Sequence, residues 1–214
     1  MVKDDSRPPL KTLKQSSMKT QKFIALSAIG LSIAFSSFSQ KIKTQEGDKN
    51  VLKSESTVNI EFTYDNMSVG KFSKEEEYIV SKKEELNSKE SGRGDTWATK
   101  WKDDQQNRFP SDFVSLFEKN TSMSASKDAK YTLIVHTTFI EPGFYTPVAF
   151  VRKFANINAD IIIVETANRD KVVAKITIEN SPGRSAAGIT DFDTGERISE
   201  AYAKAGKALG KYLK

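Results

Sequence analysis

The chain has 214 residues, with 33 Lys and Arg, 28 Asp and Glu, one His and no Cys, for a formal net charge of +5. This length suits one domain with extensions. The missing cysteines exclude disulfides, thiolate metal sites, thiol nucleophiles and a lipid-modified N-terminal cysteine, and a single His excludes zinc sites built on two imidazoles. We therefore predict no metal site and no cofactor.

The first 39 residues predict an export signal. Residues 1–17 are polar and show no periodicity, so we interpret them as a non-native upstream extension before a natural start at Met18. Two lysines then precede an uncharged stretch over residues 23–35, and small residues lead up to Gln40. A positive start, a short apolar core and small residues before the cleavage point are typical of a secretory signal peptide, here 18–39.

The apolar stretch is too short to be a membrane anchor. As a helix it rises only about 20 Å, less than a hydrocarbon core of roughly 30 Å, so no transmembrane span is expected after cleavage. Six of the cations but only two of the acids lie in the first 39 residues. The mature chain is therefore nearly neutral, and its charge no longer points to nucleic acid as a partner.

The mature chain is predicted to begin with a flexible, charged lead-in over residues 40–56 and then to fold as a single domain over 57–214. Apolar and polar residues alternate over 58–64, which predicts a first strand. A helix is predicted over 74–87, with Ser73 as its capping residue.

Two further helices are predicted before the second half of the chain. The first begins at Asp95, which is placed to cap it after the helix-breaking sequence SKESGRGD. It carries Trp97 and Trp101, which are four residues apart and hence on one helical face. Pro110 is expected to interrupt it, and Ser111 to cap a short third helix.

The second half predicts three strands, over 131–140, 156–166 and 172–179, of which the last two pair as a hairpin. Apolar positions at helical spacing then predict a long C-terminal helix that begins at Asp193 or Thr194. The order is strand, three helices, three strands, helix. We predict an α+β fold with a mostly antiparallel four-stranded sheet covered by helices.

Within the C-terminal helix, Gly206 and Gly210 are four residues apart, a spacing that allows another backbone to approach closely. In a membrane this spacing favours helix pairing, but in water it more often reflects packing inside the domain. We expect the neighbouring backbone to belong to the domain's own sheet.

An apolar, aromatic segment over residues 143–150 is the main candidate for a partner-binding surface. Its large side chains either tuck over the edge of the sheet or offer an interaction surface. A second predicted loop, 181–188, is rich in Gly, Ala and Ser, so it is either a simple exposed tip or an anion-binding part of the same surface. The predicted partner-binding residues are Phe144, Tyr145, Val148, Phe150 and Arg184.

Two alternative functions rest on other residues. Trp97 and Trp101 form either a stacking platform for a glycan or another small ligand, or part of the core. Asp191, Asp193 and Glu196 form either an irregular cation site or the acidic dyad of a hydrolase, although capping by Asp193 explains the same residues.

The second half also carries a resemblance. The segments YTLIVHTTFIEPGF, NADIIIVETA, VVAKITI and DFDTGERISEAYAKAGKALGKYL resemble secreted bacterial cell-envelope domains of unknown function, over residues 57–214. More distantly, the chain is similar to small periplasmic accessory domains of envelope assembly and transport machinery. The resemblance implies a location in the periplasm or at the outer surface and supplies no catalytic residues. We expect an exported, non-enzymatic domain that binds a protein partner in the envelope.

Overall fold

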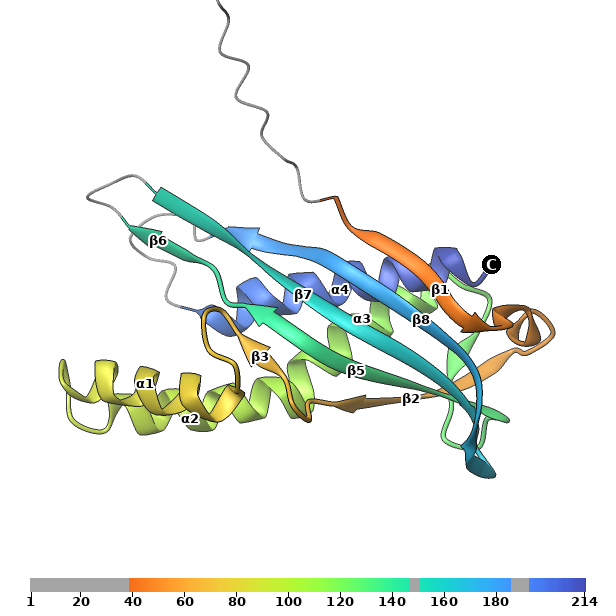
Figure 1. Ribbon diagram of the computed structural model, residues 1–214, viewed down its shortest axis with the longest axis horizontal. Coiled ribbons are helices and arrows are strands. Elements are labelled where there is room, and N and C mark those ends of the chain that lie inside the picture. The colour runs from red at the N-terminus through yellow and green to blue at the C-terminus, as the bar shows by residue number, and fades with distance from the viewer. Residues whose placement is uncertain (1–38, 147–150, 186–192) are drawn as a thin grey trace, which may run out of the picture. The chain divides into compact units, whose positions relative to one another are not determined.

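The computed structural model describes residues 39–146, 151–185 and 193–214. Within these ranges the strands form one mixed sheet in the order β1-β8-β7-β5-β2-β4, with β3 beside β5 and β6 beside β7 (Figure 1). The pairs β2–β4, β2–β5 and β3–β5 are parallel, and the other pairs are antiparallel. The strands are β1 (Lys41–Gly47), β2 (Thr57–Thr63), β3 (Ser68–Val69), β4 (Ser124–Ala125), β5 (Tyr131–Glu141), β6 (Phe144–Thr146), β7 (Val151–Glu165) and β8 (Asn168–Ser185).

Helices fill the connection between β3 and β4 and form the C-terminal end of the chain. In the described ranges, no helix is both long and apolar enough to cross a membrane. The helical elements are the 3-10 helix η1 (Lys49–Leu52), α1 (Glu75–Asn87), α2 (Arg93–Asp103), the π-helix η2 (Asp104–Arg108), α3 (Phe109–Glu118) and α4 (Thr194–Tyr212). The segments α2, η2 and α3 follow one another without a break.

The prediction of a four-stranded, mostly antiparallel sheet is wrong. β2 runs parallel to β5, from Asn59 beside Thr132 to Thr63 beside His136. A parallel pair needs a crossover connection, and the helices between these two strands supply it. An alternating pattern shows that a strand exists but not which way it runs against its neighbour, so this feature was not visible in the sequence.

The lead-in predicted over residues 40–56 is also structured. β1 pairs with β8 from Lys41 beside Glu179 to Gly47 beside Ala174. The sequence KIKTQEG is mostly polar because β1 lies at the edge of the sheet, where charged side chains are common. Its composition therefore looked like that of a linker.

The three strands predicted in the second half are confirmed as β5, β7 and β8, and β7 and β8 form the predicted antiparallel hairpin. β8 continues to Ser185, however, so residues 181–185 of the predicted loop belong to the strand. Pro182 and Gly183 lie where the register between β7 and β8 is irregular. Proline inside a strand is tolerated at such irregularities.

Of the predicted helix caps, Asp193 is confirmed, since its side chain accepts a bond from the Glu196 N–H. The residue that caps α1 is Lys74, without a side-chain bond, and not Ser73. Asp95 lies inside α2. Pro110 does not interrupt the helix, because the wider π-turn of η2 just before it accommodates its missing N–H.

The core lies between one face of the sheet and the helices. Phe109 of α3 stacks on Tyr202 of α4 with ring centroids 4.7 Å apart, and Phe62 of β2 meets Phe113 edge-on at 5.4 Å. Side chains alternate across a strand, so every second residue of the central strands faces this layer. The fully buried apolar residues among them include Leu133, Val135, Ile157, Ile161, Ile163, Ala174, Ile176 and Ile178.

Candidate functional site

Strand β6 and the first residues of β7 form a short two-stranded ribbon at one end of the sheet (Figure 1). The turn that leads into it needs glycine, because Gly143 has a φ of +69° and a Cβ there would lie 2.8 Å from the Lys153 carbonyl oxygen. Phe144 pairs with Lys153 and Thr146 with Val151. Because side chains alternate, Phe144 and Val151 lie on one face of the ribbon and Phe154 on the other.

The ribbon carries most of the large apolar side chains that the described residues expose. Phe144 is 45 % exposed, Val151 49 % and Phe154 54 %. The other two such residues, Val80 on α1 and Val172 near the start of β8, lie elsewhere on the fold. We call Phe144, Val151 and Phe154 the apolar ribbon.

The sequence prediction and the apolar ribbon overlap only in part. Phe144 belongs to both, and the backbone of Tyr145 lies in β6. Val148 and Phe150 lie outside the described residues. Val151 and Phe154 were missed because the predicted segment was ended at residue 150, although the aromatic pattern continues past it in FVRKF.

An ion pair between a buried carboxylate and an exposed lysine lies at the base of the ribbon. Glu141 is only 5 % exposed, and its carboxylate lies 2.5 Å from the Lys153 Nζ and accepts a 3.1 Å bond from the Gly143 N–H. The Nε of Arg197, a buried residue of α4, donates to the Pro142 carbonyl at 3.3 Å. The exposed side chains therefore stand on a well-anchored backbone, beside a cleft of about 390 Å³ between β6 and α1.

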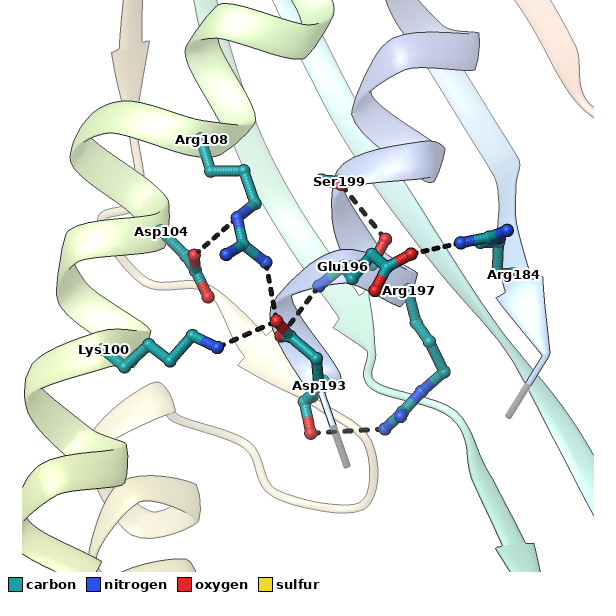
Figure 2. Close-up of polar contacts among 9 residues, drawn as sticks. Lys100, Asp104, Arg108, Arg184, Asp193, Glu196, Arg197 and Ser199 are labelled. Carbon is teal, nitrogen blue, oxygen red and sulfur yellow. Dashed lines mark hydrogen bonds and ion pairs between the residues drawn. The ribbon is translucent and has the colours of Figure 1, made fainter. Parts of the chain in front are cut away.

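Arg184, the fifth residue of the predicted surface, belongs to an ionic cluster at the start of α4 (Figure 2). It lies near the end of β8 and forms an ion pair with Glu196. Asp193 caps α4 by accepting a 3.0 Å bond from the Glu196 N–H, and its other oxygen lies 2.8 Å from the Lys100 Nζ and 3.1 Å from Arg108. The cluster thus ties α2 and η2 to the first turn of α4.

A second carboxylate, that of Asp104, completes the cluster. It is 3 % exposed and forms an ion pair with Arg108, whose Nε lies 3.0 Å away (Figure 2). Burial raises the pKa of Asp104, against the opposing effect of Arg108. Its oxygen occupies the space beside Gly195, where any Cβ would lie only 1.8 Å away. Gly195 therefore lets η2 and α4 meet at this point.

These contacts bear on the predicted acidic site. The Asp193 carboxylate is bound to two cations and a backbone N–H, and Glu196 to Arg184. Among the described residues, no three His, Cys, Asp or Glu side chains converge as metal ligands. Asp191 lies outside the described residues. The geometry gives the cation site and the hydrolase dyad no support, and gives Asp193 a structural role.

This role predicts a pH-dependent loss of stability in Asp193→Asn. Burial favours a higher pKa for Asp193, but Lys100, the Glu196 N–H and Arg108 outweigh it and lower the pKa from 3.8 to about 2. Because the folded pKa is depressed, the stabilisation is present above about pH 4 and is lost as the pH falls toward 2. Asn keeps a capping oxygen but not the charge, so we expect a loss of about 1–2 kcal/mol at neutral pH.

Denaturant midpoints of wild type and Asp193→Asn at neutral pH and at about pH 2.5 check this expectation. The difference between the two proteins should shrink at the acidic pH. A difference that stays constant would mean that the charge of Asp193 does not stabilise the fold.

The tryptophan pair is part of the packing. Trp101 is 2 % exposed and its Nε1 donates to the Glu75 Oε1 at 2.6 Å. Trp97 stacks on it with centroids 5.6 Å apart, and Tyr78 of α1 contacts both rings edge-on. Trp101 therefore has no free face on which a sugar or base could stack, whereas Trp97 is half-buried and lines a surface cleft.

A polar cavity that sequence reasoning missed lies next to this packing. It measures about 860 Å³ and is lined by the segment after β2, the start of α1, and the end of α2 with η2. Glu75 lies in its wall with the donors Trp101, Gln105 and Lys102 around it. These residues come from separate helices, and no local sequence pattern brings them together.

Comparison with known proteins gives no family. No family model and no curated protein matches the chain. Among solved structures, the chain is similar to the PelC dodecamer from Paraburkholderia phytofirmans, at 11 % identity and a TM-score of 0.35, over 78 % of this chain and 96 % of that chain. The chain is also similar to a point variant of that PelC in another crystal form, at 11 % identity and a TM-score of 0.34, over 78 % of this chain and 97 % of that chain. Both likenesses are too weak to support an argument.

Proposed function

We propose that this chain is an exported, non-enzymatic binding domain of the cell envelope, which docks on an envelope component through the apolar ribbon. The observation that carries the proposal is the exposure of Phe144, Val151 and Phe154 together at one end of the sheet. Clustered exposed apolar side chains are uncommon on a protein surface and mark interaction sites. Export is supported by the layout of residues 18–39.

The anchoring of the ribbon supports docking over a role in the core. The Glu141–Lys153 pair and the Arg197–Pro142 bond hold the chain just before Gly143, against β7 and α4. A surface whose backbone is already ordered loses little conformational entropy on binding. Aromatic residues also contribute strongly to binding energy when they are buried in an interface.

Fractionation of the native host tests both parts of the proposal. We expect the wild-type protein in the envelope fraction, with an N-terminus at Gln40. The double variant Phe144→Ser, Phe154→Ser should be exported and processed in the same way but released into the soluble fraction, because it lacks two exposed anchors. Val80→Ser, Val172→Ser is the matched control, since it removes apolar side chains of similar exposure elsewhere, and it should remain with the envelope.

Two results would count against the proposal. If the protein is found in the cytoplasm and still carries residues 18–39, it is not exported. A melting temperature of the Phe144→Ser, Phe154→Ser variant well below that of the control variant would show that these rings stabilise the fold and are not available for docking.

A further inference from the structure

The occupant of the apolar ribbon can be inferred from its shape and charge; this inference rests on the proposed function. We propose that the ribbon inserts into the interface of an anionic lipid bilayer. The first argument is that its apolar side chains lie on both faces: Phe144 and Val151 on one, Phe154 on the other. A flat protein surface covers one face of a ribbon, whereas a bilayer interface surrounds both faces of an inserted ribbon.

The charge of the ribbon is the second argument. The sequence has no acidic residue between Glu141 and Asp160, and its only charges there are Arg152 and Lys153. Lys153 is bound to Glu141, which leaves the exposed Arg152 to face the surroundings. Aromatic side chains beside a cation are typical of segments that lie in the headgroup region, where the rings bury and the cation meets lipid phosphates.

The length of the ribbon limits how deeply its paired strands can enter the bilayer. β6 pairs with β7 over three residues, from Phe144 to Thr146. At about 3.3 Å per residue this spans roughly 10 Å, which matches the depth of the interface and is far less than a hydrocarbon core of about 30 Å. The paired part of the ribbon is therefore short enough to lie within one leaflet.

Cosedimentation of the protein purified from the envelope fraction with lipid vesicles tests the inference. The probes are vesicles of phosphatidylethanolamine with phosphatidylglycerol and vesicles of phosphatidylcholine alone. We expect Phe144→Ser, Phe154→Ser to weaken binding to the anionic vesicles about a hundredfold, roughly tenfold for each ring that is partly withdrawn from water. The control Val80→Ser, Val172→Ser should bind like wild type.

The charge is tested separately with Arg152→Gln, which leaves the Glu141–Lys153 pair intact. We expect about a fivefold loss on anionic vesicles, the contribution typical of one cation near an anionic surface, and no loss on phosphatidylcholine. The fivefold difference should disappear at high salt, because screening shortens the range of the attraction.

The outcomes separate this inference from the proposed function. If wild type binds neither kind of vesicle while the native envelope still retains it through Phe144 and Phe154, the occupant is a protein and the lipid inference is overturned. If the Phe144→Ser, Phe154→Ser variant binds vesicles as tightly as wild type, the ribbon is not the contact. If the native envelope also retains that variant, the apolar ribbon is not the docking surface, and the proposed function is contradicted as well.

Discussion

Gly206→Ala is expected to destabilise the protein by about 3 kcal/mol, at the upper end for overpacking in a core. A Cβ at Gly206 would lie 2.1 Å from the Phe113 carbonyl oxygen and 2.9 Å from the carbonyl carbon. Both are backbone atoms of α3, so no side-chain rotation relieves the clash and α4 must shift. Alanine favours a helix over glycine by only about 1 kcal/mol, which is too little to offset the lost packing.

Two substitutions calibrate the Gly206→Ala measurement, made as the shift of the denaturant midpoint. Lys207→Ala changes the exposed neighbour on α4 and should stay within about 0.5 kcal/mol of wild type. Gly92→Ala meets no atom within 4 Å but has a φ of +82°, so it should cost about 1 kcal/mol from backbone strain alone. A Gly206→Ala protein as stable as wild type would show that α3 and α4 do not approach this closely.

The same glycines show how far the sequence leads. The spacing of Gly206 and Gly210 correctly indicated close approach to another backbone, but the neighbour is α3, at Phe113 and Phe117, and not the sheet as expected. A stripe of small residues reveals that something comes near without revealing what. Identifying the neighbour requires the arrangement of elements distant in sequence.

Strands were predictable where their own residues stabilise them. β5, β7 and β8 are rich in β-branched residues whose alternate side chains are buried, so their pattern is local. β1, β4 and β6 are short or polar and owe their structure to the strands beside them. The direction of β2 against β5 likewise depends on where the intervening helices pack, which no window of sequence contains.

The candidate site divides in the same way. Phe144 was found because aromatic residues in a predicted loop are unusual, and this signal is local. The ionic cluster at α4 was missed because Lys100 and Asp193 are 93 positions apart and each looks like an ordinary surface charge. The capping role of Asp193 was visible, since a cap depends on the residues that follow directly.

Glu75→Ala is expected to cost about 3–4 kcal/mol, because it removes the acceptor of buried donors and opens a small cavity. Glu75 is 6 % exposed, and its Oε1 accepts from Trp101 Nε1 at 2.6 Å and from Gln105 Nε2 at 2.7 Å. Its Oε2 lies 2.7 Å from Lys102 Nζ. Without the carboxylate, the Trp101 and Gln105 donors remain buried and lose their partner.

A double-mutant cycle separates the buried bond from the ion pair. Trp101→Phe keeps most of the ring but removes the donor, so Glu75→Ala should cost about 1–2 kcal/mol less in that background than in wild type. Lys102→Ala should cost only about 0.5 kcal/mol, because the Lys102 side chain is 50 % exposed and water screens its charge. If Lys102→Ala instead costs as much as Glu75→Ala, the ion pair and not the buried hydrogen bonds holds α1 against α2. Additive effects of Glu75→Ala and Trp101→Phe on the free energy of unfolding would show that the two side chains are not coupled.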